Sequence, residues 1–235
     1  MSTKVGIIAE GPIDHILLPA LLSAIATHKA AYKWPVKAGD VAELLPIRKT
    51  GHGGVLEKVR RLVTILKRDP LDYKFFVILL DQKTEEVQRE IREMIRGDPR
   101  FVLGIAIKEL EAWWLGDRTD TQSWCGFTHG TLPVCRYGKC DKNGRLIYAA
   151  EKDEGPKQTL DELTCLSERF DRFYGEGNID LAMQFVDEFW RVESFNGDRL
   201  DEIAVQCPHG FGEFQHAARQ AFQDAVDSTD ELLFR

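Results

Sequence analysis

Hydrophobic residues in the first half of the chain form short continuous runs that are separated by helically spaced sets. Continuous runs at 4–9, 75–80 and 101–107 predict strands, and the run at 75–80 is typical of a strand buried on both faces. Residues 41–47 are expected to form a further strand. A leucine-rich segment at 17–25 repeats at helical spacing and predicts a helix directly after the first strand.

Two further segments show the helical period. Apolar residues from Val55 to Leu66 predict a helix that ends before Pro70, and the charged segment 85–96 predicts an amphipathic helix. The resulting alternation of strands and helices favours an α/β fold with a mostly parallel sheet that is flanked by helices.

The pattern changes beyond Trp114. Residues 116–157 show little helical periodicity and hold three of the five cysteines, which favours an irregular insertion or hairpin. Helical spacing then returns at 160–173, 179–190 and 211–222. With no linker rich in Pro, Gly and Ser, one compact unit is expected. We divide it into an α/β core at 1–117, an irregular cysteine-containing insertion at 118–157 and a helical C-terminal portion packed on the core at 158–235.

Composition narrows the class of protein. The 235 residues include 31 Lys and Arg against 38 Asp and Glu, so the net charge of −7 argues against a wholly basic, histone-like binder, although a local basic strip can still meet phosphates. Five cysteines are an odd number in a chain this long, which makes a disulfide framework improbable. No apolar stretch approaches the roughly 18 residues of a membrane span, and no secretory segment is recognisable. We expect a soluble cytoplasmic protein without a membrane partner.

Acidic residues follow three of the predicted strands. Glu10 follows the first, Asp81 follows the run at 75–80, and Glu109 and Glu111 follow the run at 101–107, while Asp14 lies one helical turn after Glu10. Ligands of open parallel sheets bind beyond the carboxyl ends of the strands, so neighbouring strands would bring these acids together. Such a group suits a hard cation such as Mg²⁺. The alternative is that they cap strand ends and helix first turns.

Three segments in this order resemble the acidic motifs of Toprim-like proteins. They are Ile8-Ala-Glu10-Gly-Pro-Ile-Asp14, the apolar strand that ends at Asp81, and Ile107-Lys-Glu109-Leu-Glu111-Ala-Trp113-Trp-Leu-Gly-Asp117. The sequence resembles in particular a small bacterial family of unknown function that is related to the overcoming-lysogenization-defect (OLD) nucleases. Two later segments are also similar to that family, Gly155-Pro-Lys157 and Cys207-Pro-His-Gly-Phe-Gly-Glu-Phe214. The resemblance covers most of the chain, excepting the cysteine-bearing insertion.

The resemblance implies a Toprim fold and a nuclease that uses Mg²⁺ or Mn²⁺ to cleave phosphodiester bonds in DNA or RNA, in a phage-defence system with an ATPase partner. It implies that the catalytic residues are Glu10, Asp81, Glu109 and Glu111. On this reading Glu10 and Asp81 hold the principal metal ion, Glu109 and Glu111 complete its shell, and Asp14 is an outer ligand.

The sequence departs from the family at one point. The family has Asp-x-Asp where this chain has Asp81-Gln82-Lys83, so one acid is lost or is supplied elsewhere, for example by Glu85. Lys83 can instead contact a phosphate as a point charge. This departure motivates an alternative function, a non-catalytic Toprim-like module that binds nucleic acid or an ATPase partner.

Basic residues near the second predicted helix are candidates for nucleic-acid contacts. Lys49, Arg60 and Arg61 form part of a basic strip that could follow phosphates, although a solvated helix face explains it equally well. The segment Gly51-His-Gly-Gly54 offers backbone N–H groups to a phosphate or is a plain glycine turn. It lacks the Gly-Lys-Ser/Thr ending of a P-loop.

The cysteine-bearing insertion holds four candidate zinc ligands, Cys125, His129, Cys135 and Cys140. A structural Zn²⁺ there would replace a missing core, and free thiols in a loop are the alternative. Cys207 and His209 are interpreted as part of a structural turn. The tryptophans Trp113, Trp114 and Trp190 are expected mostly in the core, with base stacking as the alternative.

Overall fold

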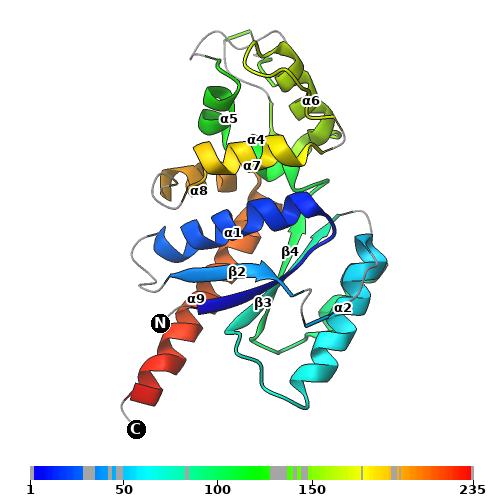
Figure 1. Cartoon of the computed structure of the whole chain (residues 1–235), viewed down its shortest axis with the longest axis vertical. Coiled ribbons are helices and arrows are strands. Elements are labelled where there is room, and N and C mark those ends of the chain that lie inside the picture. Colours follow the sequence, from blue (N-terminus) through cyan, green and yellow to red (C-terminus); the bar gives the residue numbers. More distant parts are fainter. Residues whose placement is uncertain are drawn as a thin grey trace. The chain divides into compact units, whose positions relative to one another are not determined.

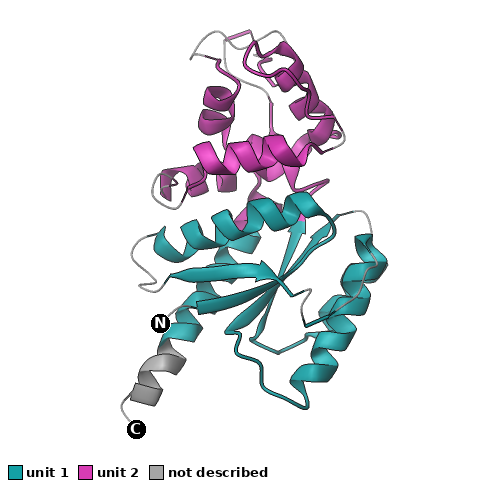
Figure 2. Ribbon diagram, viewed as in Figure 1, with its two compact units in different colours: residues 1–105, 213–235 teal, residues 106–212 magenta. Residues whose placement is uncertain are grey.

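The structure is a computed structural model. It describes residues 3–28, 35–41, 44–45, 50–82, 85–127, 137–139, 142–143, 148–175, 177–191, 195 and 197–233, with side chains of the last helix up to 226. Where the sequence led us to expect one compact unit, the chain forms two (Figure 2). Unit 1 comprises residues 1–105 and 213–235, and unit 2 comprises residues 106–212.

Unit 1 is built on a four-stranded, all-parallel sheet flanked by helices, which confirms the predicted α/β class (Figure 1). The strand order is β2-β1-β3-β4. The strands are β1 (Thr3–Ile8), β2 (Val36–Asp40), β3 (Phe75–Asp81) and β4 (Phe101–Ala106). The helices are α1 (Pro12–Thr27), α2 (Gly51–Leu66), α3 (Glu85–Met94) and α9 (Glu213–Leu233).

Strand β3 is buried along its whole apolar run because helices cover both faces of the sheet. Phe76 belongs to an apolar cluster with Val59 of α2 and Ile91 of α3. On the opposite face Phe75 packs edge-on against Phe222 of α9, with ring centroids 4.9 Å apart. Successive residues of a strand point to opposite faces, so a continuous apolar run is what a doubly covered strand requires.

The pairing of β1 with β3 needs a glycine at one position. A Cβ atom on Gly6 would lie 2.4 Å from Phe76 Cδ1 and 2.7 Å from Val41 Cγ1. The Phe76 ring therefore fills the space beside Gly6. The register of the two strands pairs Val5 with Phe75 and continues to Ile8 with Ile78.

The second strand lies at 36–40 rather than at the predicted 41–47, where the described residues Val41, Leu44 and Leu45 are outside any strand. That strand is at the edge of the sheet and half of it is exposed, so it has no continuous apolar run to recognise. Val41 and Leu45 are apolar because they are buried in the core. The Leu44 and Leu45 N–H groups both donate to the Val41 carbonyl, which forms a turn.

Unit 2 contains only helices among its described regular elements. They are α4 (Glu111–Gly116), α5 (Arg118–Trp124), α6 (Pro156–Leu166), α7 (Ile179–Glu188) and α8 (Gly197–Gln206), with short helical turns η2 (Ala150–Lys152) and η3 (Pro208–Gly212). Its core is aromatic: Trp114 stacks on Phe185 at 4.5 Å and lies 5.0 Å from Trp124 between ring centroids. Trp113, Trp114 and Trp190 are all fully buried, which confirms core packing over base stacking.

The helical C-terminal portion is confirmed, with corrections to its elements. The helix predicted at 160–173 ends at Leu166, where Ser167 leaves the helix and donates its hydroxyl to the Cys125 carbonyl at 2.7 Å. Helices α5 and α8 were not predicted, and α5 lies in the segment expected to be irregular. The last helix, α9, belongs to unit 1, whereas the other C-terminal helices belong to unit 2. No helix in the described parts of the chain is both long and apolar enough to cross a membrane.

The close approach at Gly6 predicts a strong effect of a single methyl group. Gly6→Ala should lower the free energy of unfolding by about 1–3 kcal/mol, because the new Cβ overlaps the Phe76 ring and the packed core cannot shift freely. The matched control is Gly39→Ala on β2, the register partner of Gly6, where a Cβ meets nothing within 4 Å. Urea denaturation of both variants gives the comparison, and equal losses would contradict this account.

Candidate functional site

Glu10 and Asp81 meet at the carboxyl edge of the unit 1 sheet. Glu10 follows β1 and Asp81 is the last residue of the adjacent strand β3. The Asp81 N–H donates to Glu10 Oε1 at 2.9 Å, across 71 residues of sequence. The Glu10 side chain therefore reaches the main chain at the end of the adjacent parallel strand.

His52 is a third member of this group, and the sequence reasoning did not single it out. Its Nδ1 lies 2.6 Å from Glu10 Oε1, with the His52 side chain 27% exposed and that of Glu10 14% exposed. The Nδ1 atom is itself buried, so its contact with the Glu10 carboxylate is shielded from solvent. The available signal was a histidine inside the glycine-rich start of a predicted helix.

Asp14 has a structural task in the same turn. Its Oδ2 accepts the N–H groups of Glu10 at 3.0 Å and Gly11 at 2.9 Å. This arrangement satisfies N–H groups before the first turn of α1, as a capping acid does. Asp14 thus holds the backbone that carries Glu10, which accounts for its position without a metal ion.

A second ionic pair lies at the end of β2. His15 Nε2 is 3.7 Å from Asp40 Oδ2. Burial lowers the pKa of His15; the Asp40 carboxylate opposes this shift, and the charge of Lys58 adds to it. Lys58 itself is almost fully buried. This edge of the sheet therefore carries two histidines, each next to an acid.

Glu109 and Glu111 lie in unit 2, where they share a lysine. Lys157 Nζ is 3.6 Å from Glu109 Oε1 and 3.8 Å from Glu111 Oε1. Lys157 belongs to the first turn of α6, in the Gly155-Pro-Lys157 segment. The chain turns at Lys108, whose φ of 68° lies in the left-handed region, just before both acids. The sequence reasoning did not assign Lys157 to the site.

Glu111 is a buried carboxyl group with a perturbed pKa. Burial raises its pKa above 4.5, and the positive charge of Lys157 and the Tyr174 hydrogen bond act in the opposite direction. Tyr174 donates its hydroxyl to Glu111 Oε1 at 2.9 Å. The nearby Asp117 is also buried, and burial raises its pKa strongly while Trp190 Nε1 donates to its Oδ2 at 2.8 Å.

The five acids expected around one metal ion divide between the two units. Glu10, Asp14 and Asp81 belong to unit 1, and Glu109 and Glu111 belong to unit 2. No three His, Cys, Asp or Glu side chains form a ready-made metal site within the described residues. In unit 1 the contacts already present among the candidate residues are the Glu10–His52 pair and the hydrogen bond from the Asp81 main chain to Glu10.

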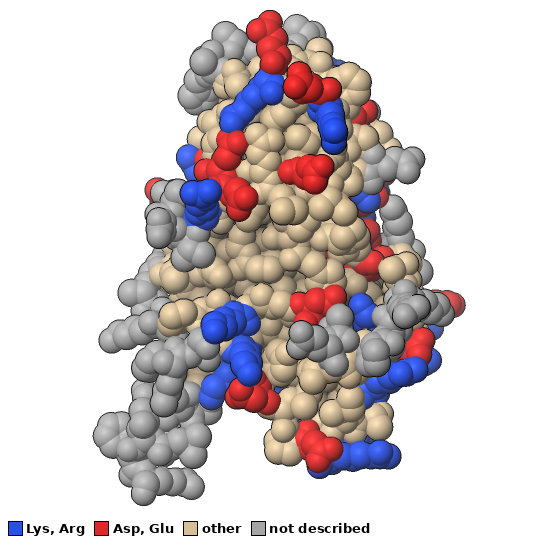
Figure 3. Space-filling view, in the orientation of Figure 1, with Lys and Arg blue, Asp and Glu red and all other residues tan. Residues whose placement is uncertain are grey.

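The predicted basic strip on α2 is engaged in ion pairs. Arg60 pairs with Glu90 of α3, and Arg61 Nη2 lies 2.8 Å from Glu57 Oε1. Both arginine side chains are 55% exposed, so they remain reachable from solvent. Among the described residues on the face shown in Figure 3, basic side chains lie next to acidic ones. The other two predicted phosphate ligands, Lys49 and Lys83, lie outside the described residues.

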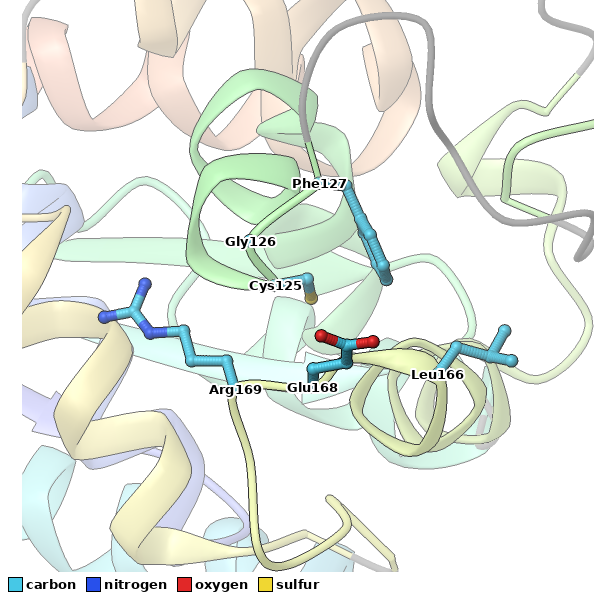
Figure 4. A pocket seen from close by; sticks show the side chains of 6 residues that line it. All are labelled: Cys125, Gly126, Phe127, Leu166, Glu168 and Arg169. Atoms are coloured by element: carbon cyan, nitrogen blue, oxygen red, sulfur yellow. The ribbon is translucent and has the colours of Figure 1, made fainter.

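The predicted zinc site is visible only at Cys125, since His129, Cys135 and Cys140 lie outside the described residues. Cys125 is buried at the end of α5. Beside it is a pocket of about 520 Å³, lined by Cys125, Gly126, Phe127, Leu166, Glu168 and Arg169 (Figure 4). In this view the Arg169 side chain points away from Cys125 and pairs with Glu188, whereas the Glu168 carboxylate points toward Cys125.

The turn around Cys207 is structural, as interpreted from the sequence. Burial raises the pKa of the Cys207 thiol, and its Sγ donates to the Ala112 carbonyl at 3.3 Å. The Glu151 carboxylate accepts the N–H groups of His209 and Gly210. A buried protonated thiol of this kind is a poor nucleophile.

Comparisons with protein-family models, curated proteins and solved structures gave no match. The candidate residues form two groups, the Glu10–Asp81–His52 group of unit 1 and the Glu109–Glu111–Lys157 group of unit 2.

The raised pKa of Glu111 predicts how stability changes with pH. The folded state holds the Glu111 proton more tightly than the unfolded chain does. Glu111 therefore makes its full contribution to the free energy of unfolding below pH 4.5, and this contribution is lost as the pH rises through its folded-state pKa. Glu111→Gln should flatten this fall in the free energy of unfolding, measured by urea denaturation over a series of pH values.

Tyr174→Phe should change the pH dependence of the free energy of unfolding in the direction opposite to Glu111→Gln. Its hydroxyl stabilises the charged carboxylate, so its removal raises the Glu111 pKa further and extends the fall to higher pH. Identical pH slopes in the parent and both variants would show that Glu111 does not titrate differently in the folded protein.

Proposed function

We propose that the protein is a metal-dependent nuclease of Toprim-like fold, whose metal ion binds at the carboxyl edge of the unit 1 sheet through Glu10 and Asp81. The single observation that carries this proposal is the hydrogen bond from the Asp81 N–H to Glu10 Oε1, which joins acids from two adjacent parallel strands. The resemblance of the surrounding segments to Toprim-like motifs supplies the reaction class. The substrate is DNA or RNA.

The residues present fit a divalent cation that also contacts a phosphate. Magnesium sites of this kind use one or two carboxylates together with waters and substrate phosphates, rather than a complete protein cage. Glu10 and Asp81 provide two such carboxylates, and the His52 imidazole lies against Glu10 with its Nδ1 2.6 Å from Glu10 Oε1. A bound ion of this type polarises the phosphate and lowers the pKa of an attacking water.

The protein's own residues hold this group in place. Asp14 fixes the turn that carries Glu10, and the Gly51 N–H donates to the Glu10 carbonyl at 3.3 Å. The Asp81 N–H orients the Glu10 carboxylate. Such fixed donors reduce the reorganisation that binding would otherwise require.

In this proposal Glu109 and Glu111 do not act as simple metal ligands. Lys157 already supplies a positive charge to both, and Tyr174 satisfies an oxygen of Glu111. The two acids position an ammonium group, which is itself a common phosphate contact. The two units would thus offer different chemistry, a metal-binding pair and a positioned lysine.

A second candidate function is a non-catalytic module that binds nucleic acid or an ATPase partner. Two observations favour it: Asp81-Gln82-Lys83 lacks the second acid of the family motif, and the described residues include no ready-made group of three metal ligands. Such a module would bind nucleic acid without divalent ions and would not cut it.

The first test separates these functions by metal-dependent stability and cleavage. Mg²⁺ or Mn²⁺ at ten times its dissociation constant should stabilise the parent by about 1.4 kcal/mol, because one ion binds only the folded state. Glu10→Gln and Asp81→Asn should lose this stabilisation and any cutting of plasmid DNA or RNA. Without divalent ions both variants should remain folded, as judged by circular dichroism.

The matched control is Asp72→Asn. Asp72 is an exposed acid that pairs with Lys4 near the start of β1 and precedes β3, so it lies at the amino edge of the same sheet. It should keep both the metal response and the cleavage. Loss of activity in this control, or a metal response that survives in both site variants, would refute the proposed site.

A second test concerns the nucleic-acid surface. Replacing Arg60 and Arg61 by Ala should weaken binding uniformly across sequences and reduce the slope of log K against log salt by about 0.9 for each lost duplex phosphate contact. The control pair is Lys4→Ala with Arg100→Ala, two ion-paired basic residues at the amino edge of the sheet. If both double variants give the parent's slope, Arg60 and Arg61 serve only their partners Glu90 and Glu57.

A further inference from the structure

We propose that the pocket beside Cys125 in unit 2 binds a small organic ammonium ion, with the Glu168 carboxylate as its anionic partner and the Phe127 ring as its aromatic one. The pocket has a volume of about 520 Å³ (Figure 4), which lies within the roughly 300–1,000 Å³ of small-molecule sites. The inference goes beyond the proposed function, because all the lining residues belong to unit 2 and none of them takes part in the proposed nuclease chemistry.

The end of α5 forms one wall of the pocket, and its main chain has a fixed shape. The Gly126 N–H donates to the Ser123 carbonyl at 3.0 Å, and the Phe127 N–H donates to the Gln122 carbonyl at 2.9 Å. Gly126 has a φ of 73°, in the left-handed region that favours glycine. These two hydrogen bonds are those of a Schellman motif. The main chain therefore sets the directions in which Cys125 and Phe127 leave the helix.

The segment that follows α6 forms the other wall and is tied to the first. The Ser167 hydroxyl donates to the Cys125 carbonyl at 2.7 Å, and the Arg169 guanidinium donates to the Trp124 carbonyl at 3.1 Å. Arg169 also pairs with Glu188, and its side chain points away from Cys125 (Figure 4). The pocket is therefore formed before a ligand binds, as most small-molecule sites are.

Glu168 brings a negative charge to the pocket. Its carboxylate points toward Cys125 (Figure 4). Glu168 makes no hydrogen bond or ion pair with another described residue, and it is exposed, so a ligand can reach it from solvent. A carboxylate that has no cationic partner attracts a positively charged ligand and repels an anionic one.

Phe127 brings an aromatic surface to the same pocket. Its ring contacts no other described aromatic ring, whereas the nearby Trp124 and Phe170 rings pack together with centroids 4.5 Å apart. Phe127 is half-buried, and Leu166 at the pocket is 49% exposed. An ammonium ion is attracted to the face of an aromatic ring as well as to a carboxylate. Phe127 and Leu166 in addition favour a ligand with an apolar body.

The test compares three probes of similar shape and different charge, which are phenethylammonium, phenethyl alcohol and phenylacetate. Each probe is titrated into the whole chain, and binding is followed by the backbone amide signals of Gly126 and Phe127 in NMR spectra. We expect phenethylammonium to bind about fivefold more tightly than phenethyl alcohol, because a partly solvated ion pair and a cation–π contact both favour the charged probe. Phenylacetate should bind more weakly than either. Equal affinities of the cationic and the neutral probe would overturn the proposal, as would no binding of phenethylammonium.

Two variants assign the effect to the residues named. Glu168→Gln keeps the shape of an exposed side chain and removes its charge, so it should bring the affinity for phenethylammonium close to that for phenethyl alcohol and leave the alcohol's affinity unchanged. Phe127→Leu keeps an apolar side chain without the ring and should weaken phenethylammonium binding by about two- to fivefold.

The matched control is Glu162→Gln, the same substitution at an exposed acid of α6 that does not line the pocket. It should bind all three probes as the parent does. Circular dichroism shows whether each variant is folded, and the exposed position of Glu168 keeps the test decisive if Phe127→Leu does not fold. An unchanged affinity for phenethylammonium in Glu168→Gln, or an equal loss in Glu162→Gln, would refute the role of Glu168 and with it the proposed site.

Discussion

The parallel pairing of β1 with β3 is the constraint on which the rest of unit 1 depends. Its register places Ile8 opposite Ile78, so the chain leaves both strands at the same edge of the sheet. Glu10 and Asp81 then lie close enough for one hydrogen bond to join them. The pairing itself needs Gly6, because the Phe76 ring occupies the space of a side chain there. Core packing and site geometry are therefore consequences of the same contact.

The carboxylates of the two acidic groups are compensated by different partners. In unit 2, Glu111 is buried, and the protein compensates with the Lys157 charge and the Tyr174 hydroxyl. In unit 1, Glu10 is partly exposed and shares its oxygen with a main-chain N–H and an imidazole. Glu111 is almost fully buried, whereas Glu10 and His52 are partly exposed and can be reached by a ligand. This difference is why we place the metal ion in unit 1.

Strands and helices that leave a pattern in neighbouring residues could be predicted from the amino-acid sequence. Continuous apolar runs predicted β1, β3 and β4, and helical periodicity predicted α2 and α3, because burial on one or both faces imposes those patterns on neighbouring residues. The same patterns placed Glu10 and Asp81 at the ends of predicted strands. Tertiary structure alone decided the edge strand β2, whose half-exposed residues carry no apolar run.

Tertiary structure also decided which partners each acid received. His52 reaches Glu10, and Lys157 reaches Glu109 and Glu111, through side-chain contacts between segments far apart in the chain. Such contacts leave no periodic pattern in the sequence, because they depend on how helices and turns pack rather than on the spacing of adjacent residues.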